Sequence, residues 1–383
     1  MLRLLIENTL DRRSSMRTVK LREISELKTG PFGTQFSANE YILEGTPVIN
    51  VKNIGYGDII TTGLDYVGID TLERLADHKL REGDIVFGRK GSVDRHCLIT
   101  KGQDGWMQGS DCIRVRFTDS FVLPDFVSYY LLTDAVKAKI NNSAVGSTMA
   151  SLNTDILGDI EINLPSHEEQ SKIAATLSAI DRKIRNNNCI NDYLQQMAYT
   201  KYMHMFYGKK SNGKLDDIIV EQPKSTIQVG EAKEASGTVP FFTSGEAILK
   251  WPEALTTGRN CFLNTGGNAD VKFYVGESAY STDTWCISAK NDMADYLYLL
   301  LDSIRLELNL KFFQGTGLKH LQKPILRDRP IYIPSDIELR EFNIKVKPWL
   351  SMISDNIRES EALISLRDWL LPMLMNGQAS IQD

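Results

Sequence analysis

The stretch that decides the fold is SHEEQSKIAATLSAIDRKIRNNNCINDYLQQMAYTKYMHMFYG, residues 166–208, together with SDIELREFNIKVKPWLSMISDNIRESEALISLRDWLLPMLMNG, residues 335–377. Each stretch follows a proline and opens with a serine that has a glutamate three residues later. A serine with glutamate at that spacing forms the capping box that starts many helices. The sequence therefore predicts two long helices.

Both stretches repeat their seam residues in alternating steps of four and three, which is the pattern of a coiled coil. The first seam is Ile173, Leu177, Ile180, Ile184, Asn187, Asn191, Leu194, Ala198, Lys201 and Met205. The second seam is Phe342, Val346, Trp349, Ile353, Asn356, Ser360, Leu363, Arg367, Leu370 and Leu374. Pro372 is expected to end or kink the second helix in its final turn.

A polar residue interrupts both seams at equivalent places, Asn187 and Asn356. A buried seam asparagine lowers stability while it fixes the register of the two helices. We predict that the helices pair antiparallel and that the two asparagines meet at the centre. A parallel pair would also align them, but each helix leads away from its own globular segment, and a pseudo-twofold arrangement of the two repeats requires antiparallel packing. Both asparagines could instead be positions that tolerate polar residues at the surface.

The chain contains a long internal repeat. Gly146–Leu152 aligns with Gly315–Leu321 at a shift of 169 residues, and the alignment runs without a gap to Gly208 and Gly377. Upstream the offset grows: Cys112-Ile113 aligns with Cys286-Ile287, and Lys20-Leu21 with Lys214-Leu215. Each copy is therefore one globular segment followed by one long helix.

The globular segments are predicted to be mostly β. Runs such as Thr46–Val51, Asp84–Phe87 and Cys112–Phe117 are rich in β-branched residues. Helices are expected at 124–140 and 293–309. The fold class is α+β: two mostly-β domains separated by two long helices that form an antiparallel coiled coil, with a pseudo-twofold internal repeat. The expected boundaries are an N-terminal extension 1–18, a first domain 19–165, a first helix 166–208, a second domain 209–334, a second helix 335–377 and a tail 378–383.

Composition excludes several classes of protein. The 383 residues carry a net charge of -5 with 42% apolar and 24% charged residues, which excludes a polycation and suits two globular domains. No apolar run is long enough to cross a membrane, and the first residues lack the features of a signal peptide. Five scattered cysteines without a C-x-x-C pair indicate reduced thiols and a cytoplasmic location.

Signatures of independent enzymes are absent. The chain has neither a phosphate-binding G-x-x-x-x-G-K-[ST] loop nor a dinucleotide-binding G-x-G-x-x-G, and its five histidines do not pair at a metal-ligand spacing. Asp217 with Glu231-Ala-Lys233 loosely fits a nuclease pattern, although solvated charged turns explain these residues as well. We expect no catalytic residues and no metal site.

Four motifs carry a resemblance to a known family. Thr29–Gln35, Gly45–Ile54, Leu152–Ile160 and Leu164–Ile173 closely resemble the specificity (S) subunit of type I restriction–modification systems. The second copy departs from the pattern, because Ile333–Leu339 lacks the Glu-Gln pair and no Gly-Pro-Phe-Gly follows Lys214. Residues 1–18 also lie outside the usual pattern, as an added helix or an upstream start with Met16 as the initiator.

The resemblance implies a DNA-recognition protein without chemistry of its own. Each globular segment would be a target recognition domain for one half of an asymmetric bipartite site in double-stranded DNA. The helices, about 60 Å long at about 1.5 Å per residue, would set the unread gap. Two methyltransferase (M) subunits would bind along them and restriction (R) subunits would join. S-adenosylmethionine would belong to the M subunits, and ATP and Mg to the R subunits, with no cofactor in this chain and no membrane partner.

Neither globular part has a net positive charge, so we expect most of the DNA-contacting residues where basic residues cluster locally. Residues 89–116 hold six Lys or Arg against three Asp, and residues 311–329 hold five against one. Arg114 and Arg116, two apart on a predicted strand, are expected on one face. The candidates are Gln35, Lys52, Arg89, Lys90, Arg95, Arg114, Arg116, Lys311, Gln314, Lys319 and Lys323. Trp285 and Trp349 are expected in the core rather than stacked on bases.

Two alternatives stay open at this point. A coiled-coil scaffold whose β domains bind proteins would show no salt-sensitive affinity for DNA. A standalone nuclease that uses Asp217 and Glu231-Ala-Lys233 would cleave DNA with Mg in the absence of partners.

Overall fold

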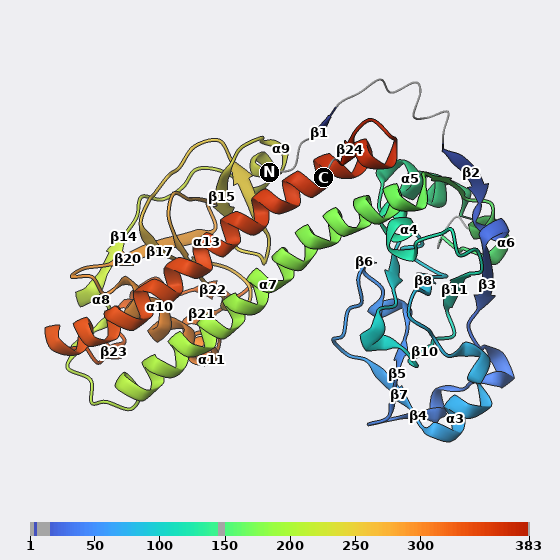
Figure 1. The fold of residues 1–383 in the computed structure, drawn as a ribbon. Coiled ribbons are helices and arrows are strands. Elements are labelled where there is room, and N and C mark those ends of the chain that lie inside the picture. The colour runs from blue at the N-terminus through green and yellow to red at the C-terminus, as the bar shows by residue number, and fades with distance from the viewer. Residues whose placement is uncertain (1–3, 6–15, 145–149, 382–383) are drawn as a thin grey trace. The chain divides into compact units, whose positions relative to one another are not determined.

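The computed structural model describes residues 4–5, 16–144 and 150–381 (Figure 1). Contacts divide the chain into two compact units, unit 1 with residues 1–182 and 363–383, and unit 2 with residues 183–362. The boundary falls inside both long helices, so each unit contains one globular part and one end of each helix.

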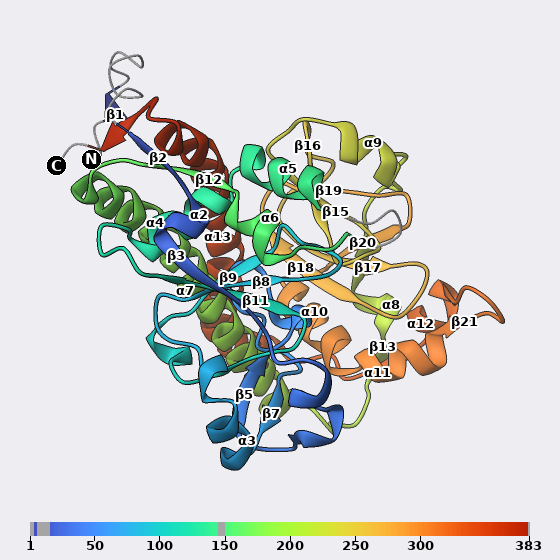
Figure 2. The ribbon, with the colours of Figure 1, turned by 90° about the vertical axis from the view of Figure 1, so that its right-hand side faces the viewer.

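Unit 1 is built on two sheets (Figure 2). The first has the order β3 (Ser25–Thr29), β11 (Cys112–Phe117), β8 (Ile85–Gly88), β9 (His96–Leu98) and β6 (Tyr56–Gly57). The second has the order β10 (Met107–Gln108), β5 (Thr46–Ile49), β7 (Asp65–Val67) and β4 (Tyr41–Ile42). Two-stranded pairs join β2 (Arg17–Lys20) to β12 (Glu161–Leu164), and β1 (Leu4–Leu5) to β24 (Ser380–Ile381).

The α-helices of unit 1 are short apart from the long pair. They are α2 (Leu21–Ile24), α3 (Ile69–Arg74), α4 (Pro124–Leu131), α5 (Asp134–Ser143) and α6 (Thr154–Gly158). Single 3-10 turns lie at Gly33–Gln35, Ala38–Glu40, Val51–Asn53, Ala76–His78 and Lys101–Gln103. Where one helix was predicted over 124–140, two helices meet at Leu132 and Thr133.

Unit 2 repeats this plan with fewer strands. Its sheets have the orders β14 (Ile219–Glu221), β20 (Thr284–Ala289), β17 (Arg259–Asn264), β18 (Val271–Val275), and β16 (Ile248–Trp251), β15 (Val239–Phe242), β19 (Ala279–Tyr280). β13 (Gly213–Lys214) pairs with β23 (Pro330–Ile331), and β21 (Phe313–Gln314) with β22 (His320–Leu321). The helices are α8 (Leu215–Ile218), α9 (Val229–Glu234), α10 (Ala294–Ser303), α11 (Arg305–Glu307) and α12 (Lys323–Arg327), with a π turn, η6, at Leu308–Phe312. The helix predicted over 293–309 is thus broken after Ser303.

The strand registers correct one part of the sequence alignment. Phe117 of β11 lies opposite Ser25, whereas Ala289 of β20 lies opposite Ile219. Ser25 and Ile219 follow the aligned pairs Lys20-Leu21 and Lys214-Leu215 at the same distance, so Phe117 corresponds to Ala289. Counting back along the strands, Ile287 corresponds to Val115, and the alignment of Cys112-Ile113 with Cys286-Ile287 was two residues out of register.

The two predicted long helices are α7 (His167–Phe206) and α13 (Asp336–Met375), which we call the spacer helices (Figure 1). Every predicted seam residue of both helices is buried or half-buried. The second capping box forms in both directions, since Ser335 N–H donates to Glu338 Oε2 and Glu338 N–H donates to Ser335 Oγ, and in the first Ser166 Oγ accepts from Glu169 N–H. α13 ends at Met375, within one turn of Pro372, as predicted.

The spacer helices are antiparallel within each unit. In unit 1, Arg367 Nη1 lies 2.9 Å from Asp181 Oδ1. In unit 2, Lys201 Nζ lies 3.7 Å from Glu341 Oε1. Asn187, which comes earlier in α7, contacts Glu359, which comes later in α13. The predicted direction of pairing is therefore confirmed.

The two seam asparagines do not meet each other. Asn187 Nδ2 donates to Ser360 Oγ at 3.2 Å and to Glu359 Oε2 at 2.9 Å. Asn356 Nδ2 donates to Asn191 Oδ1 at 2.8 Å. The register sets the two asparagines one turn apart, in neighbouring polar layers, which corrects the expectation of a single central pair. Asn187 is fully buried, and its Oδ1 has no hydrogen-bond partner among the described residues.

Each spacer helix is attached to its own globular part by a different chemistry. The buried Gln170 of α7 accepts a hydrogen bond from Leu123 N–H at 2.9 Å and donates to the carbonyls of Phe121 and Pro165, both at 3.1 Å. The repeat places Leu339 of α13 at the equivalent position, where it packs in an apolar core with Phe342. The first attachment is polar and the second is apolar.

A buried ion pair adds to the second attachment. Arg259 of β17 donates through Nε and Nη2 to Asp295 Oδ1 at 3.0 and 2.7 Å, and through Nη1 to Ser351 Oγ of α13 at 2.9 Å. Asp295 is 0% exposed, and burial raises the pKa of its carboxyl although Arg259 lowers it.

Within the described residues no helix combines the length and apolar character needed to cross a membrane.

Candidate nucleic-acid interface

The first basic cluster is organised around the loop between β8 and β9, residues 89–95. Gly91 has φ +80°, a conformation that suits glycine at a tight turn. The loop is held on both sides: Arg89 N–H donates to Asp111 O at 2.8 Å, and Arg89 O accepts from Leu152 N–H at 2.9 Å. Gly91 N–H donates to Ala150 O at 3.0 Å. The backbone of the loop therefore has a fixed position.

Two arginines of this loop lie over exposed aromatic rings. The guanidinium carbon of Arg89 is 5.8 Å from the ring centroid of Phe32, and that of Arg95 is 5.3 Å from the ring centroid of Tyr56. Lys137 Nζ of α5 also lies over the Tyr56 ring, at 5.1 Å. Cations are attracted to the negative face of such rings at these distances.

Neither arginine is neutralised by a carboxylate in the part of the chain that the structure describes. Among the described residues Arg89 and Arg95 form no ion pair, and the Nε of each is buried without a hydrogen-bond partner. Phe32 is 58% exposed and Tyr56 is 48% exposed. This surface therefore combines unpaired positive charge with exposed aromatic area.

Other predicted cations of the first domain are already paired. Lys90 Nζ lies 3.3 Å from Asp111, and Lys52 Nζ lies 2.9 Å from Asp65. Both lysines are exposed, and exposed pairs of this kind are weak, so DNA could replace these partners at little cost. Gln35 is exposed, and its carbonyl accepts from Arg74 Nη1 at 2.6 Å.

Arg114 and Arg116 were predicted to contact DNA, but the structure places both guanidinium groups against protein partners. Arg114 is 2% exposed and donates to Asp77 O at 2.8 Å and to Glu26 at 3.1 Å. Arg116 donates through Nε and Nη2 to the buried Asp84, at 2.8 and 2.6 Å. The two guanidinium groups do share one face of β11, but that face is covered, and both groups stabilise the domain.

The second basic cluster, residues 311–329, is also largely neutralised. Lys311 Nζ lies 3.2 Å from Glu307, and Arg329 Nη2 lies 2.8 Å from the same carboxylate. Lys323 Nζ lies 3.2 Å from Glu221 and 4.8 Å from the ring centroid of Trp285. Burial alone would raise the pKa of Glu221, yet its hydrogen bonds to Lys323 and Trp285 hold it below the usual value.

The hairpin of β21 and β22 is the more accessible part of this cluster. Gln314 is exposed, and its side-chain amide donates to Lys311 O at 3.2 Å. Lys319 is half-buried and forms no ion pair among the described residues. Gly315 has φ +148°, and a Cβ there would lie 2.5 Å from Leu318 O, so the turn requires glycine.

The end of this hairpin is attached as the aligned residues 150–152 are in the first domain. Leu321 N–H donates to Thr265 O at 2.9 Å, and Gly267 N–H donates to Lys319 O at 2.9 Å. These bonds match those from Leu152 to Arg89 and from Gly91 to Ala150. Thr265 therefore occupies the backbone position in the second domain that Arg89 occupies in the first.

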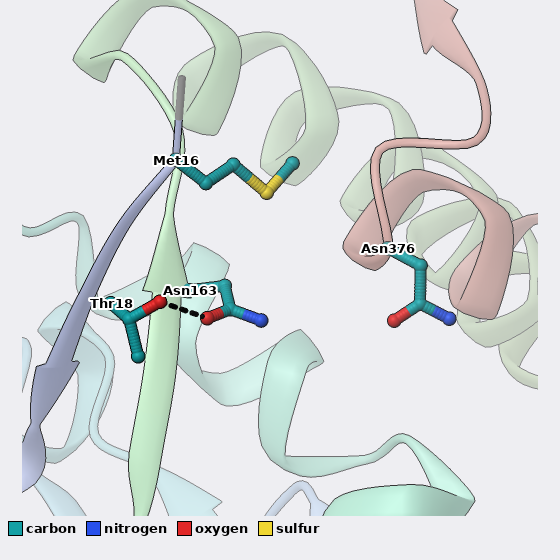
Figure 3. Close-up of a pocket in the computed structure, with 4 residues that line it drawn as sticks. All are labelled: Met16, Thr18, Asn163 and Asn376. Atoms are coloured by element: carbon teal, nitrogen blue, oxygen red, sulfur yellow. Dashed lines mark hydrogen bonds between the residues drawn. The ribbon is translucent and has the colours of Figure 1, made fainter. Parts of the chain in front are cut away.

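The cavities bring together few of the predicted residues. One of about 260 Å³ in unit 2 is lined by Lys323 and Thr265 together with Trp285 and Glu221. Another of about 300 Å³ in unit 1 is lined by Met16, Thr18, Asn163 and Asn376 (Figure 3). Thr18 Oγ1 donates to Asn163 Oδ1 there at 2.8 Å, and none of the candidate DNA contacts lines it.

The proposed nuclease residues act as helix caps. Asp217 Oδ2 accepts from Lys214 N–H at 2.7 Å, and Glu231 Oε2 accepts from Gln228 N–H at 2.7 Å. Residues 4–5, 16–144 and 150–381 contain no group of three His, Cys, Asp or Glu that could hold a metal ion. The interpretation of these residues as ordinary charged turns that cap short helices is therefore the better one.

Several features of this surface escaped the sequence reasoning. Phe32 and Tyr56 were not recognised as partners of the arginines, although Phe32 lies in the quoted motif Thr29–Gln35. Lys137 was missed because it lies on α5, outside the basic cluster.

Trp285 is buried, as predicted. For the N-terminal extension, Leu4–Leu5 form β1, and residues 1–3 and 6–15 lie outside the described part.

Comparisons with known proteins agree on one family. The family profile described as "Type I restriction modification DNA specificity domain" matches residues 14–196. The type I restriction enzyme MjaIX specificity subunit of Methanocaldococcus jannaschii is 23% identical over 395 residues, covering 88% of this chain and 90% of that protein. The HindI specificity subunit of Haemophilus influenzae is 24% identical over 164 residues, covering 41% of this chain and 36% of that protein.

A solved structure shares the fold. The S subunit of a type I restriction–modification system from M. genitalium matches with a TM-score of 0.66 at 15% identity, covering 94% of this chain and 96% of that chain. The likeness extends over both repeats and both spacer helices.

Proposed function

Because the chain belongs to the family of type I restriction–modification specificity subunits, we propose that each of its globular domains reads one half of an asymmetric bipartite site in double-stranded DNA. The observation that carries this proposal is the repeated loop attachment. Both domains hold a loop by the same backbone hydrogen bonds, to Arg89 and Leu152 in one and to Thr265 and Leu321 in the other. The two loops differ in side chains, as readers of two different half-sites would.

The spacer helices set the length of the unread gap. At about 1.5 Å per residue, a helix of 40 residues spans about 60 Å. Successive major grooves on one face of DNA are about 34–36 Å apart, so helices of this length suffice to serve two separated half-sites.

The same helices are the docking surface for two M subunits. They expose large apolar side chains that the coiled coil does not cover, which is typical of an interaction surface. These are Ile190, Tyr193 and Met197 of α7, and Ile337, Ile344, Met352, Ile364, Leu366 and Trp369 of α13. R subunits then join the assembly in the cytoplasm.

Chemistry belongs to the partners in this proposal. S-adenosylmethionine would be bound by the M subunits, and ATP with Mg by the R subunits, while this chain supplies sequence specificity alone. A net charge of -5 fits a protein that binds DNA together with partners rather than through its own charge.

The test is sequencing of the methylome of the host, with and without this gene. Loss of N6-methyladenine at one asymmetric bipartite motif with a fixed gap is the expected result. A methylome unchanged by deletion, with a demonstrably active M subunit, would favour the protein-binding scaffold instead. The purified complex should in addition bind DNA with an affinity that falls steeply as salt rises.

A further inference from the structure

The loop between β8 and β9 in unit 1 offers positive charge that the domain itself does not use. Arg89 and Arg95 lack ion pairs among the described residues, whereas Lys90, Arg114 and Arg116 are each paired with a carboxylate. A protein with net charge -5 has carboxylates available to neutralise surface arginines. Two arginines left unpaired beside one loop therefore point to an anionic ligand.

The two arginines are held by different surroundings. Arg89 has the single ring of Phe32 beside it, and its backbone is hydrogen-bonded through both N–H and C=O. Arg95 shares the ring of Tyr56 with Lys137, so two positive charges converge on one exposed aromatic side chain. Lys137 Nζ lies 3.8 Å from Asp134, which is fully exposed and therefore a weak partner, and Asp58 Oδ1 accepts from Tyr56 N–H at 3.1 Å without forming an ion pair to either cation among the described residues.

These surroundings suit two different parts of DNA. Paired cations without a strong carboxylate partner suit a phosphate, which carries no sequence information but fixes the position of the duplex. A single arginine held in place by a ring and a rigid backbone suits a base edge, where its planar fork can make two hydrogen bonds to guanine.

The second domain supports the base-reading role of position 89. Thr265 has the equivalent backbone hydrogen bonds, from its N–H to Asp283 O at 3.0 Å and from Leu321 N–H to its carbonyl at 2.9 Å. A fixed backbone site that carries arginine in one copy and threonine in the other is what two readers of different sequences require. The Thr265 hydroxyl donates to Asp283 O at 3.0 Å, which leaves its oxygen to accept a hydrogen bond from a base edge in the groove.

Resting on the proposed function, we propose that Arg89 is a specificity-determining residue of the first domain, positioned by Phe32, and that Arg95, Lys137 and Tyr56 bind the adjacent phosphate. Thr265 is the counterpart of Arg89 in the second domain. The site takes double-stranded DNA, with one base edge and one backbone phosphate as its ligands.

The experiment uses the full chain co-expressed with its M subunits and reads the methylated motif by sequencing. For Arg89→Thr and Arg89→Lys we expect tolerance of other bases at one position of one half-site, with the other half and the gap unchanged. The preference for the original base should fall about tenfold to a hundredfold. Phe32→Ala should relax the same position more weakly, and Phe32→Tyr should retain the specificity. Thr265→Ala should relax the other half-site.

The phosphate part is tested by the salt dependence of binding to a duplex that carries the wild-type motif. Arg95→Ala and Lys137→Ala should each lower the slope of log K against log salt by about one, without changing the motif. The matched control is Lys139→Ala on the same helix, whose ammonium lies 2.9 Å from Glu161 and should leave the slope unchanged.

The outcomes separate this inference from the proposed function. If the wild-type complex gives no asymmetric motif, the proposed function fails. If it gives one but Arg89→Thr leaves both halves strict, or relaxes both halves equally, the assignment of Arg89 is wrong. Arg95 and Lys137 variants that behave like Lys139→Ala would overturn the phosphate site. Thermal melts of every variant separate loss of folding from loss of recognition.

Discussion

The ion pair between Arg259 and Asp295 gives a sharp test of how α13 is attached to the second domain. Arg259 is 18% exposed in its side chain and Asp295 0%, and the same guanidinium donates to Ser351 Oγ and Lys347 O of α13. Replacing Asp295 by Asn keeps the shape of the side chain but removes the charge. The guanidinium is then left poorly compensated in a buried site.

Breaking a buried ion pair from one side costs about 3–5 kcal/mol. The lower end, about 3 kcal/mol, is expected for Asp295→Asn. One reason is that Ser351 and the carbonyl of Lys347 still accept hydrogen bonds from Arg259. Another is that burial raises the pKa of Asp295, so its charged form is already disfavoured. For units of about 150–250 residues each kcal/mol shifts Tm by about 2–4 °C, so the Tm of unit 2 should fall by about 6–12 °C.

The assay is calorimetry of the full chain together with hydrogen exchange of β17 and β20 in unit 2. The strands β8 and β11 of unit 1 serve as the internal reference and should keep their protection. Lys214→Met, which breaks an exposed pair with Asp328, is the control and should cost at most about 1 kcal/mol. Arg259→Met combined with Asp295→Leu should recover most of the loss, because no buried charge remains.

Arg259→Met alone should show a distinctive pH dependence. A buried carboxyl whose folded pKa lies above its unfolded value of 3.8 stabilises the fold below that value and loses this contribution as pH rises through the folded pKa. The variant should therefore be closer to wild type at acid pH than at neutral pH. The reasoning is refuted if Asp295→Asn is as mild as Lys214→Met, or if the double variant is as unstable as the two single losses added together.

Three further predictions concern the spacer helices. Gln170→Leu should cost about 2–3 kcal/mol in urea unfolding, because it leaves Leu123 N–H and the carbonyls of Phe121 and Pro165 without their partner; a loss below about 1 kcal/mol would contradict this attachment. Asn187→Leu should raise the urea midpoint by the equivalent of about 1 kcal/mol, because a seam asparagine lowers stability while it fixes the register of the helices. The same variant should broaden the range of gap lengths found in the methylome. A lower midpoint would argue against a register role. Hydrogen bonds from Lys209 and Ser335 lower the pKa of Glu338 to about 2, so its contribution is complete above the unfolded pKa near 4.5 and is lost as pH falls through about 2. Glu338→Gln should flatten the stability profile in that acid range, and an unchanged profile measured by circular dichroism would refute it.

The helical part of the fold could be predicted from sequence because its signals are local. The seam repeats every few residues, and each capping box lies within four residues, so a short window contains all the partners. The direction of pairing needed one further argument, the twofold repeat, and it held. The detailed register did not follow, because Asn187 and Asn356 would fit either opposite each other or one turn apart.

The β domains show where local patterns fail. The alignment of Cys112-Ile113 with Cys286-Ile287 was out by two residues, and a shift of two leaves the inward and outward alternation of a strand unchanged. No hydrophobic pattern detects such a slip. The cross-strand partners, Ser25 for Phe117 and Ile219 for Ala289, were needed to reveal it.

Charge clusters misled for a related reason. Counting Lys and Arg within a window omits carboxylates that are distant in sequence and close in space. Glu26 and Asp84 neutralise Arg114 and Arg116, and Glu221 neutralises Lys323 from about a hundred residues away. Arg89 and Arg95 remained good candidates because no such partner reaches them among the described residues.

The contrast between Gln170 and Leu339 has a consequence for how such chains can be recombined. A globular domain moved into another chain must be followed by a helix whose first turns match it. The polar backbone groups of residues 121–123 require glutamine on that helix, and the apolar core around Phe342 requires leucine. A recombination point placed after the first two turns of a helix would keep each domain with its matching helix residue. A recombination point at the proline before the helix would separate the two. We therefore expect domains to be exchanged best at points inside the helices, beyond the border that the sequence repeat suggests.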